Sequence, residues 1–286
     1  MEKNELVINV RCFNLKYTLE CGQCFRWERI ADNTYIGVIK DRVLKVKQKG
    51  NNLYVSSDKK ADLEEVVKKY FDLEKDYESI EKKISTFDDN VKKAVKNTSG
   101  IRILNQDFFE TLISYIISTN NNIPRISKSI NLISKRYGKK VVFENKEYYL
   151  FPTKNELANV KKEEYRECGV GYRDTYLADT IKDVLNGKLD NIDVNTMSTK
   201  DLNKILLSFK GVGQKVADCI LLFSCGKEEV FPIDVWVERI MSRLYFKEYK
   251  GKMSKKDILD YAKSHFGNYA GIVQQHLFYN IREGLI

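Results

Sequence analysis

Two helical patterns joined by a short glycine turn constrain this chain more than any other stretch of its sequence. Leu202, Ile205, Leu206 and Phe209 form one apolar face before the turn, and a second such face follows it. The turn is Gly211-Val212-Gly213, whose two glycines permit a positive φ and let the backbone approach a ligand closely. The amides that open the next helix suit a phosphate. An ordinary turn between two packed helices would have the same pattern, so the pattern alone identifies no function.

The periodicity of the chain changes near residue 60, and this change predicts the fold class. Apolar and polar residues alternate before that point, as in antiparallel strands, at 34–40, 42–49 and 53–57. Helical spacing follows and dominates from about residue 88. Expected helix starts there include Asp107, Ser198 and Ser254. We therefore expect an α+β fold: a small N-terminal antiparallel β-sheet domain with helices (1–87), followed by a larger all-helical region (88–286) that contains the paired helices at about 202–224.

Cys21 and Cys24 have the spacing of a metal knuckle or a redox pair, but the rest of the sequence supports neither use. A closed zinc site needs four ligands, and neither a second matching cysteine pair nor a nearby histidine is present. A redox pair would open a helix after a strand, whereas aromatic residues and Arg26 follow here. Six cysteines at irregular positions indicate a reducing interior and no disulfide framework. We expect no zinc and an incidental pair.

Charge and targeting signals narrow the setting without deciding the function. The net charge of +9 suits a polyanion partner, although a solvated basic surface would give the same value. The first ten residues lack the apolar run of a signal peptide, and no later stretch is long enough to span a membrane. We expect a cytoplasmic monomer without membrane contact, nucleoid-associated if the cell is bacterial.

The glycine turn and the residues after it resemble the helix-hairpin-helix DNA glycosylases. In that superfamily the hairpin binds the DNA backbone, often with a monovalent cation held by hairpin carbonyls. The resemblance implies DNA contacts for the hairpin residues Lys210, Gly211 and Gly213. It also places Lys215 at the catalytic lysine of the bifunctional members and Asp234, in FPID, at the catalytic aspartate.

Physical chemistry fits this assignment of Lys215 and Asp234. A lysine in the first turn of a helix lies at the positive end of the dipole, which disfavours its protonated form, and partial burial acts in the same direction. Such an amine can attack a sugar carbon. An aspartate nearby would stabilise the positive charge that develops as the base leaves. The alternatives are a phosphate contact for Lys215 and a helix N-cap for Asp234.

The resemblance narrows further to the 8-oxoguanine DNA glycosylases and covers nearly the whole chain. The segments that carry it are GQCFRW, YFDLEKDYESI, IRILNQDFFETLISYIISTNNNIPRI, GVGYRDTY, the hairpin and YAGIVQQHLF. Gly22 matches the family glycine whose carbonyl accepts a hydrogen bond from N7–H. Oxidised guanine carries that proton, whereas guanine has a bare acceptor there, and a mispaired buried polar group is costly. The site therefore needs the glycine and not the flanking sulfurs.

The same resemblance assigns the remaining pocket positions. Cys219 and Phe278 match the residues on either side of the extruded base, and Gln274 matches the amide that reads its Watson–Crick edge. Extrusion is needed because the sugar–base bond cannot be reached inside a stacked duplex. Without the resemblance, Cys219 and Phe278 would be ordinary helical core and Gln274 a surface amide.

Two further segments are implied to read the opposite strand. Asn120 and Arg125 match contacts to the cytosine left opposite the lesion, while Tyr172 and Arg173 match the wedge and the second cytosine reader. A wedge must offset the stacking that is lost, a few kcal/mol. The alternatives are a capping asparagine for Asn120 and phosphate contacts for the arginines.

Several departures from the family pattern limit the assignment. Lys210 replaces a common proline, which adds a phosphate-facing charge and removes rigidity. Trp236 stands where eukaryotic relatives carry a histidine, so a phosphate contact there is not expected. The four-cysteine loop of related enzymes is absent from the sequence, so no iron–sulfur cluster is expected.

The implied function is excision of 8-oxoguanine from duplex DNA, preferably opposite cytosine, through a lysine Schiff base, followed by strand nicking. Two alternatives remain: an alkylated-base glycosylase on the same fold, and a non-catalytic hairpin protein that only binds DNA.

Overall fold

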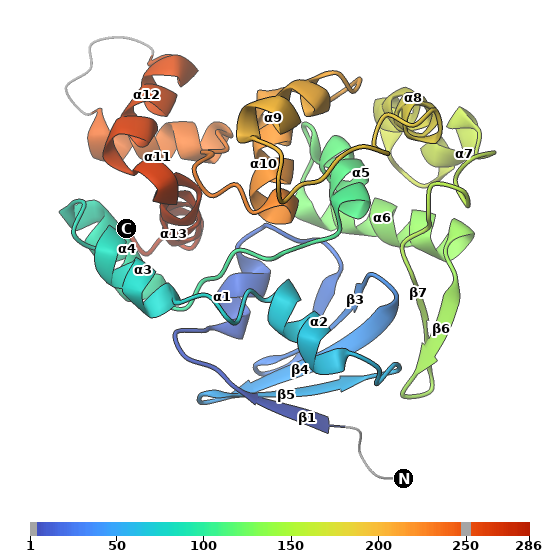
Figure 1. The fold of residues 1–286 in the computed structure, drawn as a ribbon, viewed down its shortest axis with the longest axis horizontal. Helices are drawn as coiled ribbons and strands as arrows, with labels where there is room; N and C mark the ends of the chain where they lie inside the picture. Colours follow the sequence, from blue (N-terminus) through green and yellow to red (C-terminus); the bar gives the residue numbers. More distant parts are fainter. Residues whose placement is uncertain (1–4, 247–252) are drawn as a thin grey trace.

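Residues 5–246 and 253–286 are described by the structure, a computed structural model, in which a sheet lies below a larger group of helices (Figure 1). Five antiparallel strands form the sheet in the order β1-β5-β4-β3-β2. They are β1 (Glu5–Asn9), β2 (Trp27–Ala31), β3 (Thr34–Ile39), β4 (Arg42–Lys49) and β5 (Asn52–Ser57). The first four residues of the expected sheet domain lie outside the described residues.

The alternating pattern works as expected in the centre of the sheet, where Val46 of β4 pairs with Val55 of β5 and both are fully buried. A short helix that the alternation did not predict, α1 (Leu15–Glu20), lies between β1 and β2. Asn14 starts this helix, since its side-chain oxygen accepts a hydrogen bond of 2.9 Å from the N–H of Tyr17. The end of α1 delivers the segment that contains Gly22.

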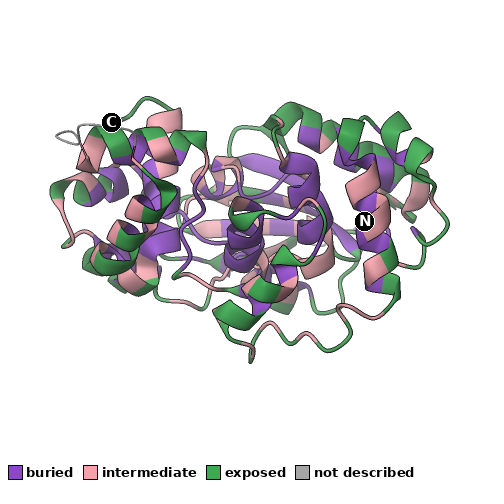
Figure 2. Cartoon of the chain, turned by 90° about the horizontal axis from the view of Figure 1, so that it is seen from above, coloured by how far each residue is buried: buried purple, intermediate pink, exposed green. Residues whose placement is uncertain are grey.

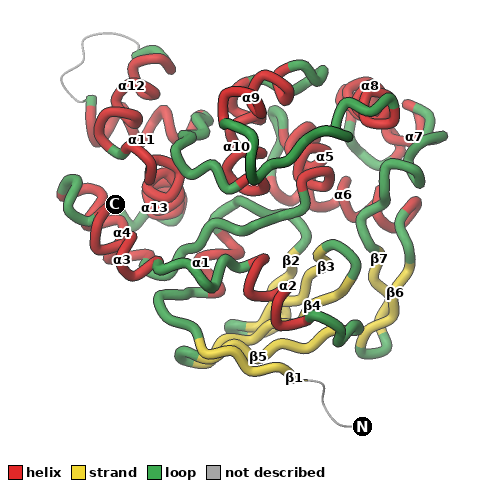
Figure 3. Tube along the Cα trace, viewed as in Figure 1, coloured by secondary structure: helices red, strands yellow, loops and turns green. Residues whose placement is uncertain are grey.

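Helices make up most of the chain after the sheet, which confirms the α+β class (Figure 3). Asp107, Ser198 and Ser254 cap helices as expected, each by accepting a bond from the N–H three residues further on. The helices include α2 (Leu63–Tyr70), α3 (Tyr77–Ile84), α4 (Asp89–Thr98), α5 (Phe108–Ser118), α6 (Ile123–Tyr137), α7 (Lys162–Glu167), η1 (Gly171–Arg173), α8 (Asp174–Leu185), α9 (Thr199–Leu207), α10 (Gln214–Cys225), α11 (Val235–Tyr245), α12 (Lys255–His265), η2 (Gly267–Tyr269) and α13 (Ala270–Arg282).

The region expected to be all helical also contains a β-hairpin, which corrects that expectation. Its strands are β6 (Lys140–Phe143) and β7 (Lys146–Tyr149). Glu144 and Asn145 both have positive φ, as a two-residue hairpin turn requires. Phe143 packs on Ile36, Val38 and Val43 of the sheet. The hairpin therefore joins the helical region to the sheet through an apolar contact.

Apolar packing does not separate the sheet from the helices at residue 87. Tyr77, Ile80 and Ile84 of α3 belong to the core formed by the later helices. The sheet's own core takes its helical cover from α1 and α2. Figure 2 shows that the buried residues are concentrated in the middle of the molecule. The division into 1–87 and 88–286 stays a prediction.

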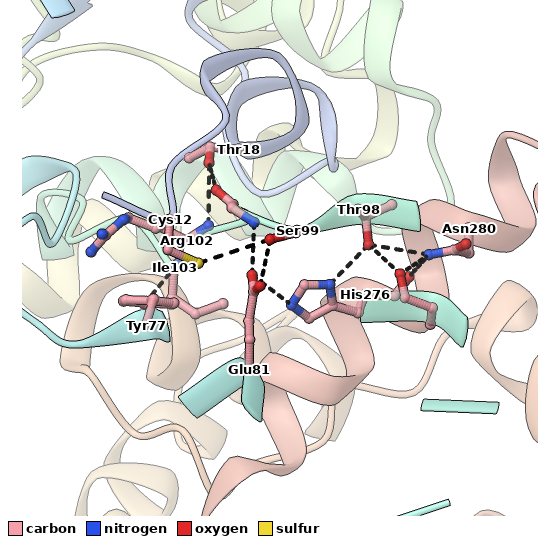
Figure 4. Close-up of polar contacts among 12 residues, drawn as sticks. Cys12, Thr18, Tyr77, Glu81, Thr98, Ser99, Arg102, Ile103, His276 and Asn280 are labelled. Carbon is pink, nitrogen blue, oxygen red and sulfur yellow. Dashed lines mark hydrogen bonds and ion pairs between the residues drawn. The ribbon is translucent and has the colours of Figure 1, made fainter. Parts of the chain in front are cut away.

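A buried polar cluster fixes α13 against α3 and α4 (Figure 4). The carboxylate of Glu81 accepts a bond of 2.6 Å from the hydroxyl of Ser99, and its Oε1 lies 3.9 Å from Nε2 of His276. Nδ1 of His276 is 2.8 Å from the hydroxyl of Thr98, which donates its proton to the carbonyl of Ala94. Burial lowers the pKa of His276 to about 3, so this histidine is neutral.

Within residues 5–246 and 253–286, no helix has both the length and the apolar character needed to cross a membrane.

Candidate active site

Lys215 and Asp234 stand at the starts of two different helices. Lys215 is the second residue of α10, and Asp234 is the N-cap of α11. Cys219 lies one turn after Lys215. Burial raises the pKa of Cys219 to about 11; the charge of Lys215 opposes this rise, while Asp218 and Asp234 add to it. The charges of Lys215 and Asp234 therefore both influence the buried thiol of Cys219, and their catalytic pairing stays a prediction.

Asp234 also has the structural role that the sequence left open. Its Oδ1 accepts a hydrogen bond of 2.9 Å from the N–H of Val237 and so caps α11. Pro232 and Ile233 before it are buried, which fixes the approach of the chain. The cap orients the carboxylate, and a carboxylate has further acceptor sites for other contacts. The structural and catalytic roles are therefore compatible.

Tyr115 connects Lys215 to the segment Gly22-Gln23-Cys24. The sequence analysis did not single out this tyrosine. Its ring centroid lies 5.3 Å from Nζ of Lys215. Its hydroxyl donates a bond of 3.2 Å to the carbonyl of Gln23. The ring also stacks on Phe223 at 5.8 Å. A buried tyrosine on α5 has the periodicity of a core residue, so the sequence held no signal for this contact.

Gly22 lies in a segment that its neighbour Gln23 holds in place. Gly22 has a φ of +83°, which glycine adopts without strain. The buried side chain of Gln23 donates bonds of 2.8 Å to the carbonyls of Thr18 and Arg102, and accepts one of 2.9 Å from the N–H of Leu104. Gln23 is thus a positioning residue that the sequence analysis missed, because a lone polar residue in a loop has no periodicity.

Gly22 and Phe278 are neighbours in space although they stand near opposite ends of the chain. A Cβ on Gly22 would lie 3.4 Å from Cε1 of Phe278 and 3.8 Å from Cδ1 of Ile123. Gln274 lies one turn before Phe278 on α13 and is buried, and its Oε1 accepts a bond of 2.7 Å from Gln275. Gly22, the residue predicted to read the lesion, therefore lies beside one predicted stacking residue.

The hairpin residues meet different requirements. Gly211 has a φ of +84°, and a Cβ there would lie 2.5 Å from the ring of Tyr176, so only glycine fits. Gly213, for which a positive φ was also allowed, has a φ of −94°, and nothing lies within 4 Å of where its Cβ would be. Nζ of Lys210 is 2.7 Å from Oδ2 of Asp179. The expected phosphate-facing charge of Lys210 is therefore paired within the protein.

The turn between α5 and α6 presents two of the predicted cytosine readers. Asn120 has a φ of +49° and is exposed, and Arg125 is exposed in the first turn of α6. The asparagine that caps α6 is Asn122, which accepts a bond of 3.1 Å from the N–H of Arg125. Tyr172 is 52% exposed, and its hydroxyl lies 3.5 Å from the carbonyl of Thr119. The predicted wedge is thus adjacent to this turn.

Arg173 differs from the other predicted DNA contacts because it is buried. Its Nε donates a bond of 2.8 Å to the carbonyl of Thr119, Nη1 donates one of 3.0 Å to Val170, and Nη2 donates one of 2.9 Å to Asn120. The guanidinium therefore fixes the turn from within. Contact with a cytosine would require these bonds to be exchanged, and the reading role stays a prediction.

Cys21 and Cys24 are free, buried thiols in the loop that carries Gly22. Burial raises the pKa of Cys21 to about 12 and raises that of Cys24 as well. Cys21 donates a bond of 3.2 Å to the carbonyl of Thr18. Because the thiolate is the form that binds metals and exchanges disulfides, this environment disfavours both uses.

Comparisons with known proteins identify the family of the chain. Residues 5–112 match the family described as 8-oxoguanine DNA glycosylase, N-terminal domain, and residues 113–263 match the HhH-GPD superfamily base excision DNA repair proteins. A protein of Methanothermobacter thermautotrophicus, named as a probable N-glycosylase/DNA lyase, is 32% identical over 77% of this chain and 75% of its own length.

Solved structures of an 8-oxoguanine glycosylase/lyase from Clostridium acetobutylicum are similar over almost the whole chain. Its apo form has a TM-score of 0.91 at 41% identity and covers 97% of this chain and 96% of its own. A complex of that enzyme with double-stranded DNA that has cytosine opposite 8-oxoguanine gives a TM-score of 0.91 at 39% identity, with 98% of this chain and 99% of its own covered. The chain belongs to the 8-oxoguanine DNA glycosylase family, within the HhH-GPD superfamily of base excision DNA repair proteins.

Proposed function

We propose that this protein excises 8-oxoguanine from duplex DNA and then cleaves the abasic strand, with Lys215 as the nucleophile. The observation that carries the proposal is the link that Tyr115 makes between Lys215 and the segment of Gly22: its ring centroid lies 5.3 Å from Nζ of Lys215, and its hydroxyl donates a bond of 3.2 Å to the carbonyl of Gln23. Two relatives have names that combine a glycosylase with a lyase, which supports both reactions in one enzyme.

The chemistry follows from an amine and a carboxylate beside an extruded nucleotide. The deprotonated amine of Lys215 attacks C1′, the glycosidic bond breaks, and its electron pair leaves with the base, which takes up a proton. Asp234 stabilises the positive charge that develops on the sugar. The amine adduct opens the ring to a Schiff base. Loss of a C2′ proton then breaks the bond from C3′ to its phosphate, and water hydrolyses the Schiff base to free Lys215.

Lesion selection is assigned to the carbonyl of Gly22. It accepts a hydrogen bond from N7–H of 8-oxoguanine and meets a bare acceptor in guanine, where the mispaired buried groups are costly. Phe278 and Cys219 cover the faces of the base, and Gln274 reads its pairing edge. The proximity of Gly22 and Phe278 supports this assignment.

Cytosine opposite the lesion is the proposed preferred context. A guanidinium can donate to the acceptors of cytosine but meets a donor on the pairing edge of adenine. The exposure of Asn120 and Arg125 supports them as readers. A monovalent cation held by carbonyls of the turn before α10 is part of the same proposal, since backbone carbonyls can replace the hydration shell of such an ion.

The test uses synthetic duplexes that carry one 8-oxoguanine opposite each of the four bases, with guanine and 3-methyladenine duplexes for comparison. We expect release of 8-oxoguanine with strand cleavage, fastest opposite cytosine, and intact guanine and 3-methyladenine. Release of 3-methyladenine in place of 8-oxoguanine would favour an alkylated-base enzyme. Binding without release from any duplex would favour a non-catalytic DNA-binding protein.

A further inference from the structure

We propose that Arg282 is a positioning residue for lesion recognition, which sets the distance between Gly22 and the ring of Phe278; this inference rests on the function proposed above. Arg282 is the last residue of α13 and lies one turn after Phe278. Its side chain is only 22% exposed, which is low for an arginine at the end of a C-terminal helix.

The guanidinium of Arg282 contacts both walls of the proposed base pocket. Nη2 donates a hydrogen bond to the carbonyl of Glu20, the last residue of α1 and two positions before Gly22. Nη1 lies 3.6 Å from where a Cβ on Gly22 would be. Cζ lies 5.7 Å from the ring centroid of Phe278. One side chain therefore links the segment that presents the Gly22 carbonyl to the ring proposed to stack on the base.

Two other contacts limit the freedom of this guanidinium. Nε donates a bond of 3.0 Å to the carboxylate of Glu283, and Cζ lies 5.1 Å from the ring centroid of Tyr279. The position at the end of α1 is also favourable, because a cation there meets the negative end of the helix dipole. The planar fork of Arg282 is therefore held with its Nη atoms toward α1, and a lysine could not reproduce this geometry.

Recognition of 8-oxoguanine needs both walls at once. The N7–H edge must reach the carbonyl of Gly22 while one face of the base lies on Phe278. These walls come from opposite ends of the chain, so a change in their separation affects the hydrogen bond and the stacking together. Cleavage of a preformed abasic site needs Lys215 but no base in the pocket. Arg282 should therefore matter for base excision and not for abasic-site cleavage.

The experiment compares Arg282→Met and Arg282→Lys with a matched control, Arg136→Met. Arg136 also lies in the last turn of a helix, α6, where it contacts the ring of Tyr137 at 5.5 Å and pairs with glutamates. It lies at the opposite end of α6 from the turn that contains Asn120. Single-turnover rates are measured for 8-oxoguanine excision and for cleavage of a preformed abasic site, together with thermal unfolding. The wild type must perform both reactions; if it performs neither, the proposed function fails and not this inference.

We expect Arg282→Met to slow excision by roughly tenfold or more, as for the loss of a charged hydrogen bond, with abasic-site cleavage at the wild-type rate. Arg282→Lys should show a smaller loss with the same selectivity, and it remains informative if the methionine variant does not fold. The control should match the wild type in both reactions. Equal losses in both reactions, or unchanged excision, would overturn the proposal.

A double-mutant cycle with Phe278→Ala tests whether Arg282 acts through the pocket. If it does, the excision loss of the double variant should be clearly smaller than the product of the two single losses, because Phe278 is the wall that Arg282 positions. Multiplicative losses would show that Arg282 acts independently of Phe278 and would overturn this route.

Discussion

Selectivity at Gly22 depends on a backbone carbonyl, so the flanking residues serve to place it. Gln23 fixes the loop through three buried hydrogen bonds, and the thiols of Cys21 and Cys24 are packed inside. The cysteine spacing that attracts attention in the sequence is thus part of the packing around a glycine. Gly22 therefore matters because it has no side chain beyond hydrogen, which permits its positive φ and its close approach to Phe278.

Gly22→Ala should slow 8-oxoguanine excision by one to two orders of magnitude, since a mispaired buried group costs roughly 1–3 kcal/mol. The reason is the φ of +83° and the 3.4 Å contact that the new methyl group would make with Phe278. Abasic-site cleavage should survive. Gly50→Ala is the control. It also puts an alanine at a position of positive φ, but that position lies in a turn of the sheet where nothing is within 4 Å of the new Cβ. Normal excision by Gly22→Ala would move lesion recognition elsewhere in the pocket.

Asp234→Asn separates the cap from the catalytic role. Asparagine caps helices about as well as aspartate, so the free energy of unfolding should change little. Loss of the charge should slow excision by about 2–3 orders of magnitude, as for the loss of a transition-state contact. Chemical denaturation and single-turnover excision give the two numbers. A near wild-type rate would reduce Asp234 to a helix cap.

At the element scale, the turn between α9 and α10 combines a required glycine with an optional one. Gly211 cannot be replaced without moving Tyr176, whereas Gly213 has extended backbone and open space around it. The free protein therefore gives no structural reason for glycine at 213. Close approach of a DNA backbone to the start of α10 would supply one.

Gly211→Ala and Gly213→Ala should consequently fail in different ways. The first should lower the free energy of unfolding by roughly 1–3 kcal/mol through overpacking and strain. The second should unfold like the wild type but bind duplex DNA more weakly, which a titration at fixed salt measures. Wild-type DNA affinity in Gly213→Ala would show that the backbone of DNA does not approach this point.

The sequence predicted those elements whose signals are local. Strand alternation gave β3 to β5, and the capping residues gave the starts of α5, α9 and α12. The hairpin β6–β7 was missed because its short strands depend on packing against the sheet. The burial of Arg173 was missed for a related reason, since the carbonyls that it binds lie on a turn distant in sequence. The roles of the site residues came from the resemblance, since periodicity alone would have assigned Cys219 and Phe278 to the helical core.

Whole-molecule stability should depend on pH through the buried histidine of α13. His276 has a pKa of about 3 in the folded protein because of burial, whereas the unfolded chain has about 6.5. Below pH 6.5 the unfolded state therefore binds a proton that the folded state does not, and stability falls. The stability that depends on a neutral His276 is fully present above pH 6.5 and is lost as the pH decreases toward 3.

Comparison of the wild type with His276→Gln isolates this effect. In urea unfolding between pH 7.5 and 5, the wild type should lose up to about 1.4 kcal/mol more per pH unit below 6.5 than the variant. Burial raises the pKa of Glu110 to about 7 and that of Asp218 to about 6, so these groups favour folding at lower pH. They are common to both proteins and cancel in the difference. Parallel pH profiles would mean that His276 is not held neutral.

The central claim, that Lys215 forms a covalent intermediate with the sugar, is tested most directly by borohydride trapping on 8-oxoguanine duplex. The wild type should yield a protein–DNA adduct, because reduction fixes the Schiff base. Lys215→Gln should yield none and should release no base, while it still binds the lesion duplex. A folded Lys215→Gln protein that is trapped, or that excises 8-oxoguanine at the wild-type rate, would contradict the account.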